Sequence, residues 1–268
     1  MSTIFFGSTA VILYFWVTFR LGTRLSKGID GVKGKKLPIA VGMGAATLHG
    51  LVVYATLITE SGLNLSFFNA LSLLTWLVAF LLLVAAITKP IEHLGLVILP
   101  LAAISTALSL IFPAGQTHLN DAQVGLDLHI LISILAFSLL NIAAIQALLL
   151  AIQNKHLHNR QPGGFVRALP PLQTMEQLLF QMIGAGFFLQ TLSLASGFVF
   201  LDDMFAQHMV HKTILALAAW LFFATLLWGH WRYGWRGKTA VRWTLGGFSM
   251  LLLAYFGSKL VFELVLGR

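Results

Sequence analysis

Long apolar segments separated by short polar ones dominate the chain. A helix that crosses a hydrocarbon core of about 30 Å needs roughly 20 predominantly apolar residues. Eight segments come close to or exceed this length: 3–18, 37–58, 66–87, 94–112, 125–153, 177–201, 213–229 and 243–265. We predict a membrane-spanning helix in each, and therefore an all-α polytopic membrane protein with about eight transmembrane helices.

The composition agrees with a surface that faces lipid. Hydrophobic residues make up 58% of the 268 positions, charged residues make up 10%, and the mean hydropathy is +0.86. A soluble domain usually carries about 25% charged residues. No polar stretch is long enough to form a separate soluble domain, so we predict a single transmembrane domain over residues 1–268. The sequence contains no Cys, which excludes thiolate metal sites and Cys-based catalysis.

The positive charges gather on one side of the predicted helices. Fourteen of the seventeen Lys and Arg residues lie in the polar segments 20–36, 88–93, 153–176 and 230–242. The segments on the opposite side carry mostly acids. Under the positive-inside rule the basic segments are cytoplasmic, which places both termini outside, on the periplasmic side. The net charge of +8 then faces anionic lipid head groups, and nucleic acid is not needed to explain it.

Small and polar residues interrupt the second and fifth apolar segments. Gly42, Ala46 and Gly50 follow one another at four-residue spacing, which favours close approach of a neighbouring helix. His49 lies beside this seam, about 13 Å below the outer end of its helix, and His129 lies about 7 Å below the outer boundary. Two imidazoles at similar depth can hold one metal centre. The alternative for each is a hydrogen bond to a neighbouring helix.

Further histidines and arginines lie where the predicted spans begin or end. His211 precedes the seventh span, and His230 closes it at the inner face, followed by Arg232 and Arg236. His93 lies in an inner turn, where we expect a solvated surface residue. The sequence contains no H-E-x-x-H, P-loop or G-x-S-x-G motif, so no catalytic residue is proposed.

The last third of the chain resembles a known family. A His ends a span at His230, and the turn Gly234-Trp235-Arg236-Gly237 follows it. The next span carries Gly247-Phe248 and then Tyr255-Phe256-Gly257. This order of motifs is similar to the end of the cytochrome c assembly (CcsA/HemX-like) membrane proteins.

The resemblance extends over most of the chain. Residues 126–153 resemble the family's helix with an outward-facing histidine, and residues 170–198 resemble the segment and span that follow it. Residues 64–76 are similar to the accessory branch typified by YpjD. The resemblance implies a haem-handling, multi-pass protein of the bacterial inner membrane. It places His129 at the outward-facing histidine and His49 at an early intramembrane one.

Two features of the family are missing from the sequence. The Trp-rich haem platform expected between the sixth and seventh spans is replaced by residues 201–212, which contain no Trp. No His follows Tyr255-Phe256-Gly257, where a second outward-facing histidine is expected. The resemblance therefore implies an accessory or regulatory haem binder, not a full haem lyase. The partners it implies are membrane lipid, haem and proteins of cytochrome c assembly or haem synthesis.

The cofactor predicted on this basis is haem b, bound permanently or transiently. The cofactor-binding candidates are His49, His129, His230, His211, Arg232 and Arg236. We predict the first two as metal ligands, while an inner arginine could pair with haem propionates. Two alternatives remain open. A non-haem scaffold or partner subunit of a transporter or enzyme would explain the missing Trp platform, and a transporter is favoured only by scattered Ser, Asn and Gln residues.

Overall fold

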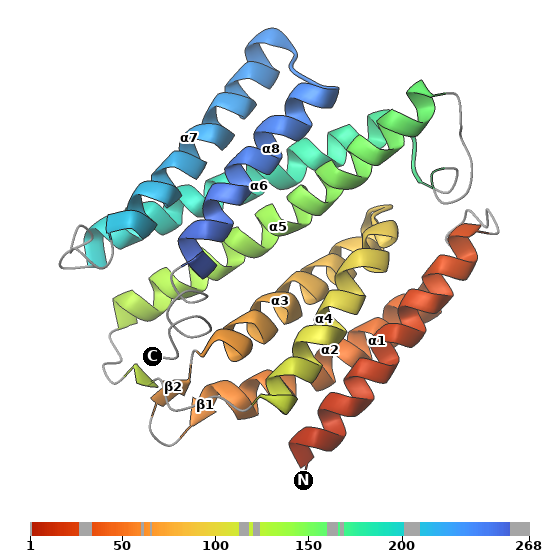
Figure 1. Ribbon diagram of the computed structural model, residues 1–268, viewed down its shortest axis with the longest axis vertical. Helices are drawn as coiled ribbons and strands as arrows, with labels where there is room; N and C mark the ends of the chain where they lie inside the picture. The colour runs from red at the N-terminus through yellow and green to blue at the C-terminus, as the bar shows by residue number, and fades with distance from the viewer. Residues whose placement is uncertain are drawn as a thin grey trace. The chain divides into compact units, whose positions relative to one another are not determined.

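The computed structural model describes residues 2–26, 34–59, 62–64, 66–112, 118–119, 124–159, 166, 169–200 and 210–257. Eight α-helices form within these ranges (Figure 1). They are α1 (Ser2–Ser26), α2 (Lys36–Leu57), α3 (Phe67–Thr88), α4 (Gly95–Ile111), α5 (Val124–His158), α6 (Leu172–Phe200), α7 (Val210–Tyr233) and α8 (Gly237–Leu252).

Short elements complete the described chain. A 3-10 turn, η2 (Glu92–Leu94), precedes α4, and a π-helical turn, η4 (Leu253–Gly257), continues α8. Three short antiparallel strands, β1 (Ile58–Thr59), β2 (Gly62–Asn64) and β3 (His118–Leu119), form a sheet in the order β1-β2-β3. β1 follows directly on α2, and β2 lies shortly before α3.

The predicted all-α polytopic membrane fold is confirmed. Within the described ranges, seven helices, α1 to α7, are long and apolar enough to cross a membrane. The eighth helix, α8, has 16 residues. Several helices extend beyond the predicted segments, most of all α1, which continues to Ser26, and α8, which begins at Gly237. Both helices run on into basic sequence, since long Lys and Arg side chains can extend to the interface from a helix end. The outer location of both termini stays a prediction.

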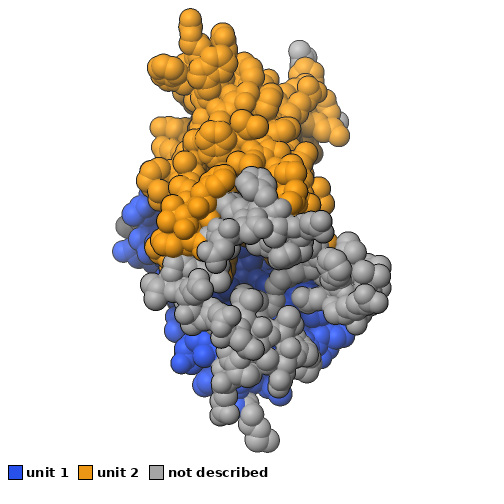
Figure 2. Space-filling model, turned by 90° about the vertical axis from the view of Figure 1, so that its left-hand side faces the viewer, with its two compact units in different colours: residues 1–121, 162–170 blue, residues 122–161, 171–268 orange. Residues whose placement is uncertain are grey.

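The chain divides into two compact units, coloured separately in Figure 2. Unit 1 comprises Met1–Asp121 and Pro162–Pro170, and unit 2 comprises Ala122–Gln161 and Pro171–Arg268. In unit 1, α1 and α3 each pack against both α2 and α4. In unit 2, α5 and α7 each pack against both α6 and α8. Each unit is thus a ring of four helices with its own core, and the single domain predicted from the composition stays a prediction.

Small residues bring α2 and α3 together, as the four-residue spacing predicted. A Cβ atom placed on Gly42 would lie 2.8 Å from Cδ2 of Leu83, and one on Gly50 would lie 3.0 Å from Nε1 of Trp76. The same indole N–H donates a hydrogen bond to the Ala46 carbonyl at 2.7 Å. Close packing of α3 along this seam therefore depends on the absence of a side chain at Gly42 and Gly50 of α2.

The expectation that His93 is a solvated surface residue was wrong. His93 lies in η2 and is buried. The turn packs against α1, α3 and α4, so it closes one end of unit 1. A histidine in a short inner turn can therefore belong to the core when the turn folds back under the helices.

Glycines shape the turn between α7 and α8. Gly234 has φ +66° and Gly237 has φ +55°, a left-handed backbone that favours glycine at the end of a helix. The Gly234 N–H donates to the His230 carbonyl at 3.1 Å, and the Trp235 N–H donates to the Gly229 carbonyl at 3.2 Å. The Trp235 indole packs over Gly229, where a side chain would collide with it. The turn is therefore tight and is fixed to the last turn of α7.

Candidate functional site

His49 lies on α2 at the centre of unit 1, with its side chain fully buried. Its Nε2 lies 2.9 Å from Oγ1 of Thr106, whose own hydrogen is donated to the Ala102 carbonyl at 2.7 Å. A hydroxyl that donates elsewhere accepts here, so Nε2 carries the imidazole hydrogen. The Tyr14 hydroxyl donates to Nδ1 at 3.4 Å, and the Ser72 hydroxyl oxygen lies 3.0 Å from Nε2.

Both ring nitrogens of His49 therefore serve contacts between helices. α1, α3 and α4 each supply one hydroxyl to this imidazole of α2, so one side chain joins all four helices of unit 1. A metal ligand needs a nitrogen with an accessible lone pair, whereas Nδ1 faces the Tyr14 hydroxyl. This geometry fits the alternative in which the histidine bonds to neighbouring helices. Its role as a metal ligand stays a prediction.

His129 lies in the first turns of α5 and faces α6. Its Nδ1 lies 3.0 Å from the Ser193 carbonyl oxygen and 3.0 Å from the Ser196 hydroxyl. Because a carbonyl oxygen can only accept, Nδ1 donates, and Nε2 of the neutral ring keeps its lone pair. Ser133 supports this contact, since its hydroxyl donates to the His129 carbonyl at 2.6 Å and also contacts the Ser193 hydroxyl at 2.6 Å. In the described part of the chain no hydrogen-bond partner faces Nε2.

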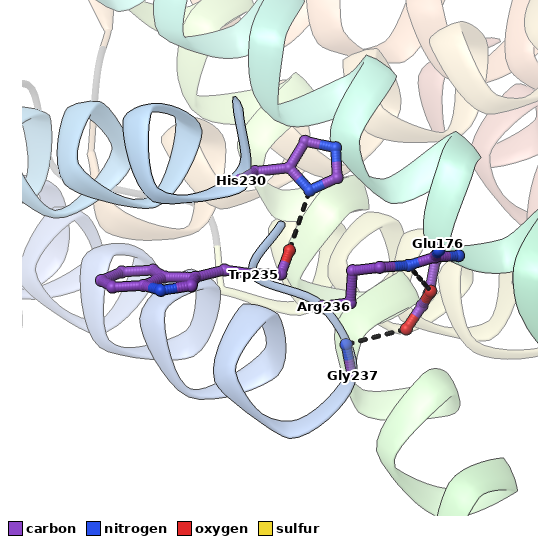
Figure 3. Close-up of polar contacts among 5 residues, drawn as sticks. All are labelled: Glu176, His230, Trp235, Arg236 and Gly237. Atoms are coloured by element: carbon purple, nitrogen blue, oxygen red, sulfur yellow. Dashed lines mark hydrogen bonds and ion pairs between the residues drawn. The ribbon is translucent and has the colours of Figure 1, made fainter. Parts of the chain in front are cut away.

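His230 lies at the end of α7 and faces the turn into α8 (Figure 3). Its Nδ1 lies 2.8 Å from the Trp235 carbonyl oxygen, so Nδ1 donates and Nε2 of the neutral ring keeps its lone pair. Phe180 of α6 stacks on the imidazole, with ring centroids 3.5 Å apart and planes inclined by 16°. Metal-ligating histidines usually donate their other ring N–H to a carbonyl or carboxylate in this way. The arrangement leaves the Nε2 lone pair of His230 without a hydrogen, as a metal ligand requires.

Glu176, in the first turns of α6, completes this arrangement and was missed by the reasoning from sequence. Its side chain is only 8% exposed. One carboxylate oxygen, Oε2, accepts from Nε of Arg236 at 2.9 Å, and the other, Oε1, accepts from the Gly237 N–H at 2.8 Å. Figure 3 shows the carboxylate and the guanidinium pointing toward one another. A signal was present, since Glu176 is the lone acid in the basic segment 153–176.

A hollow of about 550 Å³ opens beside His230. Its lining includes Glu176, His230, Arg236, Phe180 and three glutamines that repeat every four residues along α6, Gln173, Gln177 and Gln181. Ligand and cofactor pockets commonly have volumes of about 300–1,000 Å³. The groups around this hollow offer a nitrogen lone pair, an aromatic face and a guanidinium. Among the described residues of this lining, Phe180 is the one apolar side chain, and the other lining side chains are polar.

The structure brings together only some of the predicted cofactor-binding residues. His230 and Arg236 line the same hollow. Arg232 is exposed, and its guanidinium lies over the Tyr233 ring, 5.8 Å from the centroid. His211 is exposed in the first turn of α7, at the opposite end of that helix from His230.

His129 and His230 belong to the same unit but lie near opposite ends of α6. His129 contacts Ser193, whereas His230 stacks on Phe180, and these positions lie about 20 Å apart along the helix axis. The two imidazoles therefore cannot share one iron. His49 lies in unit 1, so the predicted ligand pair of His49 and His129 joins two units and stays a prediction. Over the described ranges, no cluster of three or more His, Asp or Glu side chains could hold a metal ion.

These features define a class of protein, namely a multi-pass α-helical membrane protein with a histidine beside an open hollow in one four-helix unit. The chain belongs to the cytochrome c assembly protein family, which matches residues 38–266. The resemblance noted from the motifs around His230 is thereby confirmed.

Individual relatives agree with this assignment. Inner membrane protein YpjD of Escherichia coli (strain K12) is 32% identical over 238 residues, which cover 86% of this chain and 88% of the relative. Cytochrome c biogenesis protein CcsA of Prochlorococcus marinus (strain NATL1A) is 30% identical over 111 residues, which cover 41% of this chain and 34% of the relative. No solved structure shows a significant match. The likeness to YpjD and the seven apolar helices confirm the predicted multi-pass location in the bacterial inner membrane.

Proposed function

We propose that the chain is an accessory or regulatory haem-binding protein and that His230 holds the haem in unit 2. One observation carries this proposal. The Nδ1–H of His230 is donated to the Trp235 carbonyl, which leaves the Nε2 lone pair beside a hollow of about 550 Å³. Haem iron accepts a neutral imidazole as an axial ligand. Membership of the cytochrome c assembly family supports haem as the metal-containing ligand.

The other groups around the hollow suit the remaining parts of a haem. Arg236 uses Nε for Glu176, so the terminal nitrogens of its half-exposed side chain can pair with a propionate. Phe180 offers an apolar face, and the glutamines of α6 offer amide donors. The haem itself would supply a redox-active iron, while these residues bind and orient it. Haem b is the form that we propose.

His129 shares the ligand-type hydrogen bond but lies about 20 Å away along α6. We therefore propose His129 as a second, separate position for haem contact. His49 holds the helices of unit 1 together in this proposal. The proposed partners are proteins of cytochrome c assembly or of haem synthesis that deliver or receive the haem.

The test is hemin titration of the detergent-purified protein, combined with absorbance spectra and a pyridine haemochrome assay. For the natural sequence we expect a Soret band with added hemin, and the α and β bands of haem b in the reduced pyridine haemochrome. His230→Ala should lose the larger part of the haem. His156→Ala is a matched control, because His156 is half-buried on α5 and its Nδ1 also bonds to a backbone carbonyl, that of Ile152. His49→Gln should keep the haem.

Two results would contradict the proposal in different ways. Full occupancy and an unchanged spectrum in His230→Ala would exclude His230 as the ligand. If His49→Gln and His129→Ala lost the haem instead, the ligand pair predicted from helical depth would be supported. A colourless protein that takes up no added hemin would favour the non-haem scaffold.

A further inference from the structure

We propose that Glu176 is a positioning residue that fixes the tautomer of His230 without touching it. The carboxylate holds the turn between α7 and α8, and the turn presents the carbonyl that receives the imidazole hydrogen (Figure 3). This inference rests on the proposed role of His230 as the haem ligand. It adds that Glu176 determines whether Nε2 of His230 has a lone pair for the iron.

The carboxylate of Glu176 is fully used by the turn. Oε2 accepts from Arg236 and Oε1 accepts from the Gly237 N–H, at 2.9 Å and 2.8 Å. A carboxylate with so little exposed surface is costly unless it is paired and hydrogen-bonded. Both oxygens therefore tie α6 to two successive residues of the turn.

These contacts control the direction of the Trp235 carbonyl. Glu176 holds the side chain of Arg236 and the N–H of the Arg236–Gly237 peptide, so the peptide that contains the Trp235 carbonyl is held at its Arg236 end. The Trp235 N–H is bonded to the Gly229 carbonyl at 3.2 Å, which holds the residue from its other side. Glu176 and Gly229 thus clamp the turn at both ends, and the carbonyl between them points to Nδ1 of His230.

The direction of this carbonyl decides which imidazole nitrogen carries the hydrogen. A neutral imidazole has one donor nitrogen and one acceptor nitrogen. With the Trp235 carbonyl in place, Nδ1 is the donor and Nε2 can bind iron. Without the clamp, the hydrogen is free to occupy Nε2, and that tautomer has no lone pair for the metal. Loss of such a supporting contact typically weakens metal binding by about 10–100-fold.

The decisive variant is Glu176→Gln. It keeps the size of the side chain, but an NH2 group, which donates and cannot accept, replaces one of the two oxygens that accept from Arg236 and Gly237. The first readout needs no haem: it is the nitrogen chemical shifts of the His230 ring in protein labelled with ¹⁵N-histidine, assigned by their loss in His230→Ala. The second readout is the hemin dissociation constant. Glu92→Gln, the same substitution in η2 of unit 1, is the control.

We expect the natural sequence and Glu92→Gln to show a protonated Nδ1 and an unprotonated Nε2. Glu176→Gln should show a mixture of the two tautomers and bind hemin about 10–100-fold more weakly. Unchanged ring shifts together with hemin affinity within about twofold of the natural protein would overturn the proposal. A residue that only stabilises the fold would leave the His230 tautomer unchanged.

A second variant covers the case in which Glu176→Gln does not fold. Arg236→Gln removes only one of the two contacts, so the Gly237 N–H still binds the carboxylate. We expect an intermediate shift of the tautomer, and no shift would count against the clamp. If the natural protein binds no hemin, the proposed function fails, while the ring shifts of the haem-free variants still decide the positioning role.

Discussion

The contact between Tyr14 and His49 should stabilise unit 1 more than its length suggests. Tyr14→Phe removes the hydroxyl that faces Nδ1 at 3.4 Å and leaves a fully buried acceptor without that donor. Hydrogen bonds between membrane helices contribute on average about 0.6 kcal/mol and at most about 1.7 kcal/mol. Removing one partner of a buried polar group costs about 1–3 kcal/mol. We therefore expect a loss of about 1–2 kcal/mol in the free energy of unfolding.

Thr106→Val provides the internal comparison. The Thr106 hydroxyl is closer to the ring, at 2.9 Å from Nε2, but Nε2 keeps the Ser72 hydroxyl at 3.0 Å after the change. No buried group of His49 is then left without a partner. We expect a loss below about 1 kcal/mol. The longer contact, from Tyr14, should thus contribute more to the free energy of unfolding, because no other group of the described residues bonds to Nδ1 when the Tyr14 hydroxyl is removed.

The measurement is equilibrium unfolding in mixed micelles with increasing SDS, followed by far-UV circular dichroism and tryptophan fluorescence. Tyr54→Phe is the matched control, since Tyr54 lies on α2 with its side chain exposed. The reasoning is refuted if Tyr14→Phe behaves like Tyr54→Phe. It is also refuted if Thr106→Val proves the more destabilising of the two buried changes.

Two further predictions concern glycines. Gly50→Ala should destabilise unit 1 by about 1–3 kcal/mol, because the added Cβ would lie 3.0 Å from the indole nitrogen of Trp76, which is itself hydrogen-bonded. Gly44→Ala is the control in the same unfolding assay: its Cβ meets nothing within 4 Å, so it should be neutral or slightly stabilising. Gly234→Ala should cost about 1–2 kcal/mol from backbone strain alone, because φ is +66° and the added Cβ meets no neighbouring atom within 4 Å. Equal unfolding midpoints for Gly234→Ala and the natural protein would show that the turn tolerates a side chain.

The hydropathy pattern predicted the helices well but not how they group. Apolar length alone located the spans, because only a helix satisfies its backbone inside lipid. The ends were displaced where Arg20 and Lys238 extend a helix into basic sequence. The division into two rings of four helices has no counterpart in composition, since every span is similarly apolar. The seam of small residues on α2 is the one place where the sequence correctly predicted which face of a helix packs closely against a neighbouring helix.

The candidate site was predicted in part. His230 and Arg236 were selected from the sequence, and the structure places both at one hollow. Glu176 was missed because its burial depends on a turn 60 residues further along the chain. A single acid among bases is a weak signal by itself. Glu176 becomes informative once it is known to lie in α6 beside Arg236.

His49, His129 and His230 differ in the group that faces Nδ1, and this group decides which ring nitrogen keeps a lone pair. Tyrosine presents a hydroxyl that donates to Nδ1 of His49, so the imidazole hydrogen sits on Nε2. Backbone carbonyls accept from Nδ1 of His129 and His230, so Nε2 is left with its lone pair. Depth along a helix, which sequence provides, cannot separate these cases. The histidines differ because the fold places a backbone carbonyl at Nδ1 of His129 and of His230 but not of His49. At His230 this carbonyl belongs to a turn that the buried carboxylate of Glu176 holds. Ligand capacity in this chain is therefore a property of the backbone around each histidine, as much as of the histidine itself.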